Sequence, residues 1–311
     1  MDVVAVINYK GGVGKTTVTS NIAAELAFKG KKVLLLDTDA QASLTFSFIH
    51  PDVWDAEFKE DLTIKSWFDA ISEGKEPPPL NEFIIIPPQV NEHLRVSGAT
   101  GTIDLICSHL GLINVDLELA TLLGGANMQQ SKLNYIKVHA KLRDAIIKLE
   151  QESDYDILLI DCPPNFNIVT KNAIVASQKI LIPAKPDYLS TLGIDYLTQS
   201  VDQLVREFNE YAAMDSKVSS ISPEVLGVVF TMIQINSGRP ISAQRQYIAQ
   251  TKRTGIFTYE GYFRENKTMF ASAPESLVPA VLQYHVAGTY ADIVDELGDF
   301  VSEFEGTLED A

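Results

Sequence analysis

The segment at residues 10–17, Lys-Gly-Gly-Val-Gly-Lys-Thr-Thr, restricts the possible folds of this chain more than any other segment. It follows an apolar run at residues 3–7 and precedes a helical pattern at residues 16–28, so the predicted order is strand, loop, helix. Glycines at positions 11, 12 and 14 allow the backbone to curl until several N–H groups point inward. Together with the positive end of the helix dipole, these N–H groups form a site for phosphate oxygens.

Two side chains of this loop add charge and a hydroxyl to the backbone donors. Lys15 can neutralise the β- and γ-phosphates of a nucleotide, and the Thr16 hydroxyl can bind Mg²⁺. The alternative is an ordinary glycine-rich turn that carries a lysine, but such a turn requires neither the strand nor the helix beside it. The predicted nucleotide-binding residues are Lys10, Gly11, Gly12, Val13, Gly14, Lys15, Thr16 and Thr17.

Short apolar runs alternate with amphipathic stretches along most of the chain. The amphipathic stretches predict helices, among them residues 16–28, 132–150 and 189–208. The apolar runs consist of Val, Ile and Leu with little interruption, which is typical of strands that are buried on both faces. We therefore predict an α/β fold, a doubly wound and mainly parallel sheet with helices on both faces. The predicted strands are residues 3–7, 33–36, 83–86, 103–106, 157–160, 180–182 and 225–230.

The composition, with 46% hydrophobic and 21% charged residues, is typical of a soluble globular protein. We predict one domain over residues 1–311, with an insertion at about 50–102 and a C-terminal acidic helix at residues 289–305. Cys107 and Cys162 are far apart and in no metal-binding spacing, which favours a reducing compartment. No 18 apolar residues run together and no signal peptide is evident, so we expect a cytoplasmic protein.

Acidic residues follow two of the predicted strands. Asp37 and Asp39 come after the run at residues 34–36, and Asp161 comes directly after the run at 157–160. Open α/β sheets bind ligands at the carboxyl ends of their strands, so we expect these acids beside the phosphate loop. Asp161 is predicted to hold Mg²⁺ through water. For Asp39, capping of a helix that begins near Ala42 is an alternative.

The loop with a lysine at its first position resembles the deviant Walker A motif of the ParA/MinD group of P-loop ATPases, and the chain is most similar to the ParA/Soj-type partition ATPases. The resemblance implies ATP and Mg²⁺ as cofactors and a homodimer in the ATP state. In that dimer Lys10 would reach the phosphates bound by the other subunit, as an arginine finger does. A solvated loop lysine is the alternative for Lys10.

The segment at residues 37–43 resembles the family's Asp-x-Asp-Pro-Gln signature, with Ala40 in place of proline. The resemblance assigns Asp39 to orienting the attacking water and Asp37 to a supporting position near the magnesium. The predicted catalytic residues are therefore Lys10, Lys15 and Asp39, and the predicted metal residues are Thr16, Asp37 and Asp161. Cys162 stands where the family usually has threonine, and we interpret it as a buried thiol.

Weaker matches extend the resemblance over most of the chain. Residues 103–106 and 180–183 are similar to two apolar segments of the family, and residues 165–176 resemble its switch II helix. Residues 271–275 lie near the family's adenine segment, but they match it weakly, so the sequence leaves the base contacts open.

The formal charge of -16 argues against a surface that attracts nucleic acid everywhere. Residues 239–267 reverse this sign, since six cations against two acids give +4. In the ParA family the corresponding region binds DNA through its phosphates, without sequence preference. A solvated helix face with core aromatics is the alternative. The candidate DNA-binding residues are Arg239, Arg245, Lys252, Arg253, Arg264 and Lys267.

The last twenty residues contain eight acids and no cation, although they form an apolar stripe at helical spacing. In the MinD branch a terminal helix binds membrane, but anionic lipid would repel this one. We therefore expect no membrane partner and a helix that packs on the domain.

The resemblance implies a nucleoid-associated ATPase that hydrolyses ATP slowly and positions a plasmid, chromosome or protein cargo. Its expected partners are double-stranded DNA and a ParB-like or cargo-adaptor activator. Three alternatives remain: a MinD-like membrane switch, a metabolic or redox member of the superfamily, and a non-catalytic interaction module. The last would more readily have lost Lys15, Asp39 or Asp161.

Overall fold

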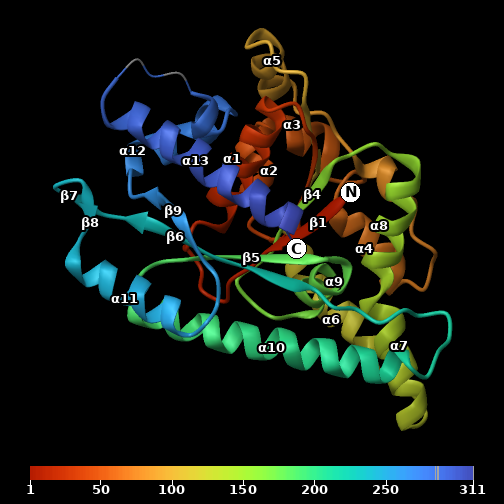
Figure 1. Ribbon diagram of the computed structural model, residues 1–311. Helices are drawn as coiled ribbons and strands as arrows, with labels where there is room; N and C mark the ends of the chain where they lie inside the picture. The colour runs from red at the N-terminus through yellow and green to blue at the C-terminus, as the bar shows by residue number, and fades with distance from the viewer. Residues whose placement is uncertain (284, 286, 311) are drawn as a thin grey trace.

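The computed structural model describes residues 1–283, 285 and 287–310. Its main sheet has seven strands in the order β3-β2-β4-β1-β5-β6-β9, and every neighbouring pair is parallel. The predicted α/β fold class is confirmed (Figure 1). The strands are β1 (Asp2–Val6), β2 (Lys32–Asp37), β3 (Thr102–Ile106), β4 (Ile157–Asp161), β5 (Lys179–Ala184), β6 (Glu224–Ile233) and β9 (Thr258–Arg264), and a separate hairpin pairs β7 (Ile235–Asn236) with β8 (Arg239–Pro240).

Alternate side chains of the inner strands enter two different hydrophobic clusters, one on each face of the sheet. In β2, Val33 and Leu35 belong to one cluster, and Leu34 and Leu36 belong to the other. Helices α1 (Lys15–Phe28) and α13 (Thr289–Asp310) cover the first face, and α9 (Ile168–Ala176) and α10 (Tyr188–Ala212) cover the second (Figure 1). The other α-helices are α2 (Ser43–Phe48), α3 (Pro51–Val53), α4 (Ile64–Ser72), α5 (Pro88–Val96), α6 (Leu112–Thr121), α7 (Met128–His139), α8 (Lys141–Glu152), α11 (Ser242–Arg253) and α12 (Lys267–Ser276).

The strand order brings the predicted functional segments together at the carboxyl end of the sheet. Strand β4 lies between β1 and β2, and its last residue, Asp161, is in register with Asp37 at the end of β2. On the other side Asp161 is in register with Val6, the last residue of β1. The loop that follows β1 therefore starts beside both acids, although they are distant in the sequence.

One predicted strand is wrong. Residues 83–86 do not join the sheet as a strand: Phe83 ends the 3₁₀ helix η2 (Leu80–Phe83), and Ile85 makes only an isolated antiparallel bridge with Leu105. Pro87 follows at once and has no backbone N–H, so a ladder cannot continue through it.

The predicted helix at residues 132–150 is also wrong in its extent, because two helices, α7 and α8, occupy this region and meet at Ala140. Strand β9, at one edge of the sheet, was not among the predicted strands. Tyr259 and Phe263 of β9 are 3% and 2% exposed. These aromatic residues of the basic region are therefore core residues on a strand and do not lie on a helix face.

The segment between β2 and β3 contains α2 to α5, η2 and a π-helical turn, η1 (Trp54–Phe58). Its status as an insertion in a single domain stays a prediction, and the predicted boundary at residue 311 lies outside the described residues. Helix α13 begins at Thr289, the predicted start, but continues to Asp310, beyond the predicted end at residue 305. Its Ile293, Leu297, Phe300 and Phe304 are at most 1% exposed. Among the described helices, none has the length and apolar character needed to cross a membrane.

Candidate functional site

The predicted phosphate loop curls between β1 and the start of α1. Gly12 and Gly14 have φ angles of 67° and 82°, a left-handed conformation that favours glycine. Gly14 is the N-cap of α1 and offers no capping side chain. The first N–H groups of the helix are therefore left for an external acceptor, and an anion such as a phosphate is the acceptor that the helix dipole favours.

Lys15 is nearly enclosed, with 6% of the residue exposed. Its Nζ donates to the backbone carbonyl of Asn8 at 3.3 Å. Burial lowers the pKa of Lys15, while the nearby carboxylates of Asp161 and Asp39 act to raise it. The fold therefore holds this ammonium group beside the acids and inside the loop, where it can pair with a phosphate.

Thr16 and Asp161 meet at the start of α1, where the Thr16 Oγ1 donates to the Asp161 Oδ2 at 2.6 Å. Asp161 is 1% exposed, and burial, followed by the Asp37 carboxylate, raises its pKa. Its Oδ1 is buried and accepts no hydrogen bond from any described residue. An unsatisfied carboxylate oxygen beside a threonine hydroxyl is a donor set that suits a hydrated Mg²⁺.

The described residues include no cluster of three or more His, Cys, Asp or Glu side chains that could hold a metal ion. Mg²⁺ usually keeps waters and binds one or two carboxylates together with substrate phosphates.

Asp37 is fully buried, and protein donors occupy both of its carboxylate oxygens. Its Oδ2 accepts from the backbone N–H and the Oγ1 of Thr45, each at 2.8 Å, and its Oδ1 accepts from the Asp39 N–H at 3.1 Å. Burial, as the largest influence, raises the pKa of Asp37. Asp37 thus shapes the loop around Asp39, and its contact with a metal stays a prediction.

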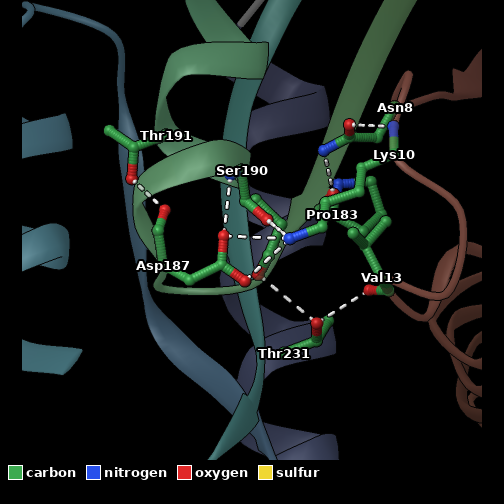
Figure 2. A network of polar contacts seen from close by, with 9 residues as sticks. Asn8, Lys10, Val13, Pro183, Asp187, Ser190, Thr191 and Thr231 are labelled. Carbon is green, nitrogen blue, oxygen red and sulfur yellow. Dashed lines mark hydrogen bonds and ion pairs between the residues drawn. The ribbon is translucent and has the colours of Figure 1, made fainter.

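Lys10 lies on the other side of the loop, in a polar network with the start of α10 (Figure 2). Its Nζ lies 3.0 and 2.8 Å from the Oδ1 and Oδ2 of Asp187 and 3.2 Å from the Ser190 Oγ. Burial acts to raise the pKa of Asp187, but the hydrogen bonds from Lys10 and Ser190 outweigh it and lower the pKa. In this structure Lys10 therefore pairs within its own subunit.

Three further hydrogen bonds in Figure 2 hold the phosphate loop in place, and two of them reach the strands beside it. The Asn8 Nδ2 donates to the carbonyl of Pro183 at 2.8 Å, and its Oδ1 accepts from the Lys10 N–H at 2.9 Å. The Thr231 Oγ1 donates to the carbonyl of Val13 at 2.7 Å. Side chains thus tie the loop to β5 and β6.

A cavity of about 150 Å³ opens next to Gly14 and Thr17. Its lining is largely apolar and comes from the end of β6, the end of β9 and the start of α12. Met232 lines it in a left-handed conformation, with φ of 54°. Phe270 lines it from α12, one residue before residues 271–275, which match the family's adenine segment only weakly.

The six candidate DNA-binding cations do not share one environment. Arg264 is engaged by the acidic helix α13, with its Nη2 2.7 Å from the Glu296 Oε1, and Lys252 pairs with Glu260. The other four, Arg239, Arg245, Arg253 and Lys267, are exposed and form no ion pair with any described residue. Arg245 and Arg253 lie on α11, which begins beside the β7–β8 hairpin (Figure 1).

Several residues of the site escaped the sequence analysis. Asp187 lies three residues beyond the end of β5 and precedes Ser190 by three positions, and an aspartate just before a helical pattern is typical of a helix N-cap. That pattern could have revealed the cap but not the pairing with Lys10, because 177 positions separate the two residues. Thr45, Ser108 and Thr231 act through single hydroxyls and have no linear signal.

A glycine-rich loop between β1 and α1, with an acid at the end of β4, defines the site of a P-loop nucleotide-binding protein. A family model described as an AAA domain, AAA_31, matches residues 1–214. The chain therefore belongs to this family, which is of the ParA/MinD type.

Two relatives extend this finding. The chromosome partitioning protein ParA of Myxococcus xanthus is 29% identical over 213 residues, which cover 68% of this chain but only 62% of that protein's length. The sporulation initiation inhibitor protein Soj of Bacillus subtilis is 26% identical over 306 residues, covering 95% of this chain and 97% of Soj.

Solved structures agree on the fold. An ATP complex of McdA from Cyanothece has a TM-score of 0.68 at 18% identity, covering 98% of this chain and 96% of McdA. Cobyrinic acid a,c-diamide synthase from Mycobacterium smegmatis with bound ADP and magnesium has a TM-score of 0.63 at 19% identity, covering 99% and 96%. One fold thus accommodates different activities, so function must be argued from the site.

Proposed function

We propose that this protein is a ParA-like ATPase that binds Mg-ATP, forms a nucleotide sandwich dimer and hydrolyses ATP slowly. The observation that carries the proposal is the buried Asp161 Oδ1, which lacks a partner among the described residues although Thr16 and Lys15 lie beside it. A bound Mg²⁺ would neutralise negative charge on the phosphates. Thr16 and Asp161 would hold it, and Lys15 would bind the phosphates.

The cavity beside Gly14 and Thr17 suits the base of the nucleotide. Phe263 and Phe270 offer apolar surface, and Glu265 and Asn266 add polar groups to the lining. This location continues directly from the phosphate loop, since Gly14 belongs to both. The adenine contacts that the sequence left open are therefore assigned to the ends of β6 and β9 and to α12.

Catalysis in this proposal needs two subunits. Asp39 orients the attacking water, and Lys10 leaves Asp187 to stabilise the charge that develops on the phosphate bound by the other subunit. Hydrolysis is slow because both conditions must be met at once. The family relationship to ParA and Soj supports this arrangement.

The ATP-bound dimer is proposed to bind DNA without sequence preference through exposed cations at residues 239–267. DNA binding of this kind would make the protein a cytoplasmic, nucleoid-associated ATPase. It would position a plasmid, chromosome or protein cargo and would be activated by a ParB-like protein or a cargo adaptor. The names of the partitioning relatives support it. A membrane anchor formed by α13 is not supported, because its apolar residues are buried in the domain.

The substitution Lys15→Ala tests the nucleotide site. ATP affinity in the presence of Mg²⁺, measured by calorimetry, should fall by at least about tenfold, since a hydrogen bond to a charged group is worth about 1.5–3 kcal/mol. Lys137→Ala, at an exposed lysine of α7, is the matched control and should bind as the parent does. If Lys15→Ala keeps the parent's affinity, the phosphate-loop assignment fails.

A further inference from the structure

The loop that carries Asp39 is tied to the neighbouring strand by Ser108, which lies two residues beyond the end of β3 and is fully buried. Strands β2 and β3 are parallel neighbours, with Leu36 in register with Ile106. The segments that follow both strands therefore leave the sheet side by side. Ser108 thus arrives next to the loop of Asp37 and Asp39 by virtue of strand register alone.

All three polar groups of Ser108 are engaged there. Its Oγ donates to the backbone carbonyl of Asp39 at 2.6 Å, and its N–H donates to the Thr45 Oγ1 at 2.9 Å. Its carbonyl accepts from the indole Nε1 of Trp54 at 3.1 Å, so the segment between β2 and β3 also holds it in place. Ser108 has one low-energy position in this environment, since each of its hydrogen bonds restricts it in a different direction.

These contacts close a ring of hydrogen bonds through four residues. Thr45 Oγ1 donates to Asp37 Oδ2, the Asp39 N–H donates to Asp37 Oδ1, and Ser108 links Thr45 back to Asp39. The peptide groups on both sides of the Asp39 Cα are therefore fixed, one through its N–H and one through its carbonyl. Only the side chain of Asp39 retains freedom, and its Oδ1 accepts from the Gln41 N–H at 3.0 Å.

We infer that Ser108 is a positioning residue for ATP hydrolysis, which acts by holding the backbone of Asp39 so that its carboxylate faces the attacking water. The inference rests on the proposed function. A general base must lie within hydrogen-bond distance of the group on which it acts, and a displacement of about 1 Å can lower a rate by roughly a hundredfold. The nucleotide itself contacts the phosphate loop, which the ring does not include, so binding should be spared.

The substitution Ser108→Ala removes one donor from the Asp39 carbonyl and leaves a second, since the Ala42 N–H also donates to it at 2.8 Å. The loop can therefore shift without unfolding. We expect kcat for ATP hydrolysis to fall by about tenfold to a hundredfold, with KM and ATP affinity unchanged. Ser72→Ala is the matched control, because the Ser72 Oγ also donates to an aspartate backbone carbonyl, that of Asp69 at 2.9 Å, and takes no part in the ring.

A double-mutant cycle with Asp39→Ala separates positioning from general structural damage. If Ser108 acts through Asp39, adding Ser108→Ala to Asp39→Ala should lower hydrolysis no further. An equal further loss in that background, a parent-like kcat for Ser108→Ala, or a fall in ATP affinity would each overturn the inference. Thermal unfolding of each variant shows whether it is folded. If Ser108→Ala does not fold, the pair Thr45→Val and Thr45→Ser tests the same ring, because valine removes the Thr45 hydroxyl and serine keeps it.

The proposed function has a different failure. If Asp39→Ala alone leaves hydrolysis at the parent rate, then Asp39 has no part in hydrolysis and the proposed mechanism fails. If Asp39→Ala abolishes hydrolysis and Ser108→Ala does not change it, the mechanism stands and only the inferred role of Ser108 is wrong.

Discussion

Lys10 and Lys15 belong to the same loop, yet the fold gives them different environments. Lys15 is 6% exposed and lies among the acids of the site, whereas the Lys10 side chain is 33% exposed and pairs with Asp187. A half-exposed ion pair of this kind is worth about 0–1 kcal/mol. Asp187 therefore holds Lys10 weakly enough to release it. Asp187 and any acceptor on a second subunit compete for the same Lys10 ammonium group.

The substitution Asp187→Asn tests this competition. Asn caps a helix as well as Asp does, so α10 should keep its start, while Lys10 loses its charged partner. We expect ATP-dependent dimerisation to strengthen by up to about thirtyfold, the equivalent of about 1 kcal/mol at each of the two symmetric sites, as measured by sedimentation across protein concentrations. In a Lys10→Ala background the same substitution should change nothing. Weaker dimerisation of Asp187→Asn would contradict the idea that the pair restrains Lys10.

At the scale of elements, the basic region of residues 239–267 is divided among a hairpin, α11, β9 and the start of α12. The strand residue Arg264 is engaged by the acids of α13, so it is a poor candidate for a phosphate contact. Helix α11 carries Arg245 and Arg253 on exposed positions. We therefore assign the main part of the proposed DNA surface to α11.

Charge reversal on α11 tests that assignment. The double substitution Arg245→Glu and Arg253→Glu should weaken DNA binding in the ATP state for all sequences alike and lower the salt dependence by about 0.9 in the log–log slope for each phosphate that is no longer neutralised. Reversal of the exposed Lys137 and Lys217 changes the net charge equally and lies away from α11, so it should have a much smaller effect. Fluorescence anisotropy with duplexes of two unrelated sequences provides the measurement. Parent-like binding by the α11 variant would exclude this helix as the DNA surface.

The elements that the sequence predicted well are those in which a local pattern and the tertiary environment agree. Residues 157–160 are apolar without interruption and form a central strand, and the glycines of residues 10–17 adopt the turn that their spacing suggested. Residues 83–86 are equally apolar, but they lie between prolines and do not form a sheet ladder. Apolar sequence alone does not distinguish the two cases.

Within the site, the sequence predicted the groups that are proposed to bind ligand but not the groups that hold them in place. Lys15, Thr16 and Asp161 lie close together, because Lys15 and Thr16 begin α1 and Asp161 ends β4 at the carboxyl end of the sheet. The contacts of Ser108 with Asp39 and of Asp187 with Lys10 join residues 69 and 177 positions apart. Such pairs depend on strand register and helix placement, which a single sequence does not specify.

At the scale of the whole molecule, the proposed sandwich dimer requires the phosphate loops of two subunits to approach each other. Gly11 is exposed in the single chain, and a Cβ at this position would lie 3.9 Å from Pro164, an ordinary contact. Its φ angle is not among the positive ones, so a larger residue is compatible with the backbone. The fold of the single subunit therefore does not require glycine at position 11, and the proposed dimer supplies a reason for it: a side chain there would face the second phosphate loop.

The substitution Gly11→Val uses this difference to test the dimer. The variant should fold with the parent's thermal stability and still bind ATP, but its ATP-dependent dimer should be weakened by at least about tenfold, because overpacking costs about 1–3 kcal/mol and two-fold symmetry imposes it twice. Dimerisation is measured by sedimentation with ATP in the Asp39→Ala background. Hydrolysis is expected to be slow there, so the proteins with and without Gly11→Val are compared in the same ATP-bound state. Lys137→Ala is the control for a substitution far from the loop. A Gly11→Val protein that dimerises as the parent does would mean that the phosphate loops do not face each other, and the role of Lys10 across the interface would have to be abandoned with them.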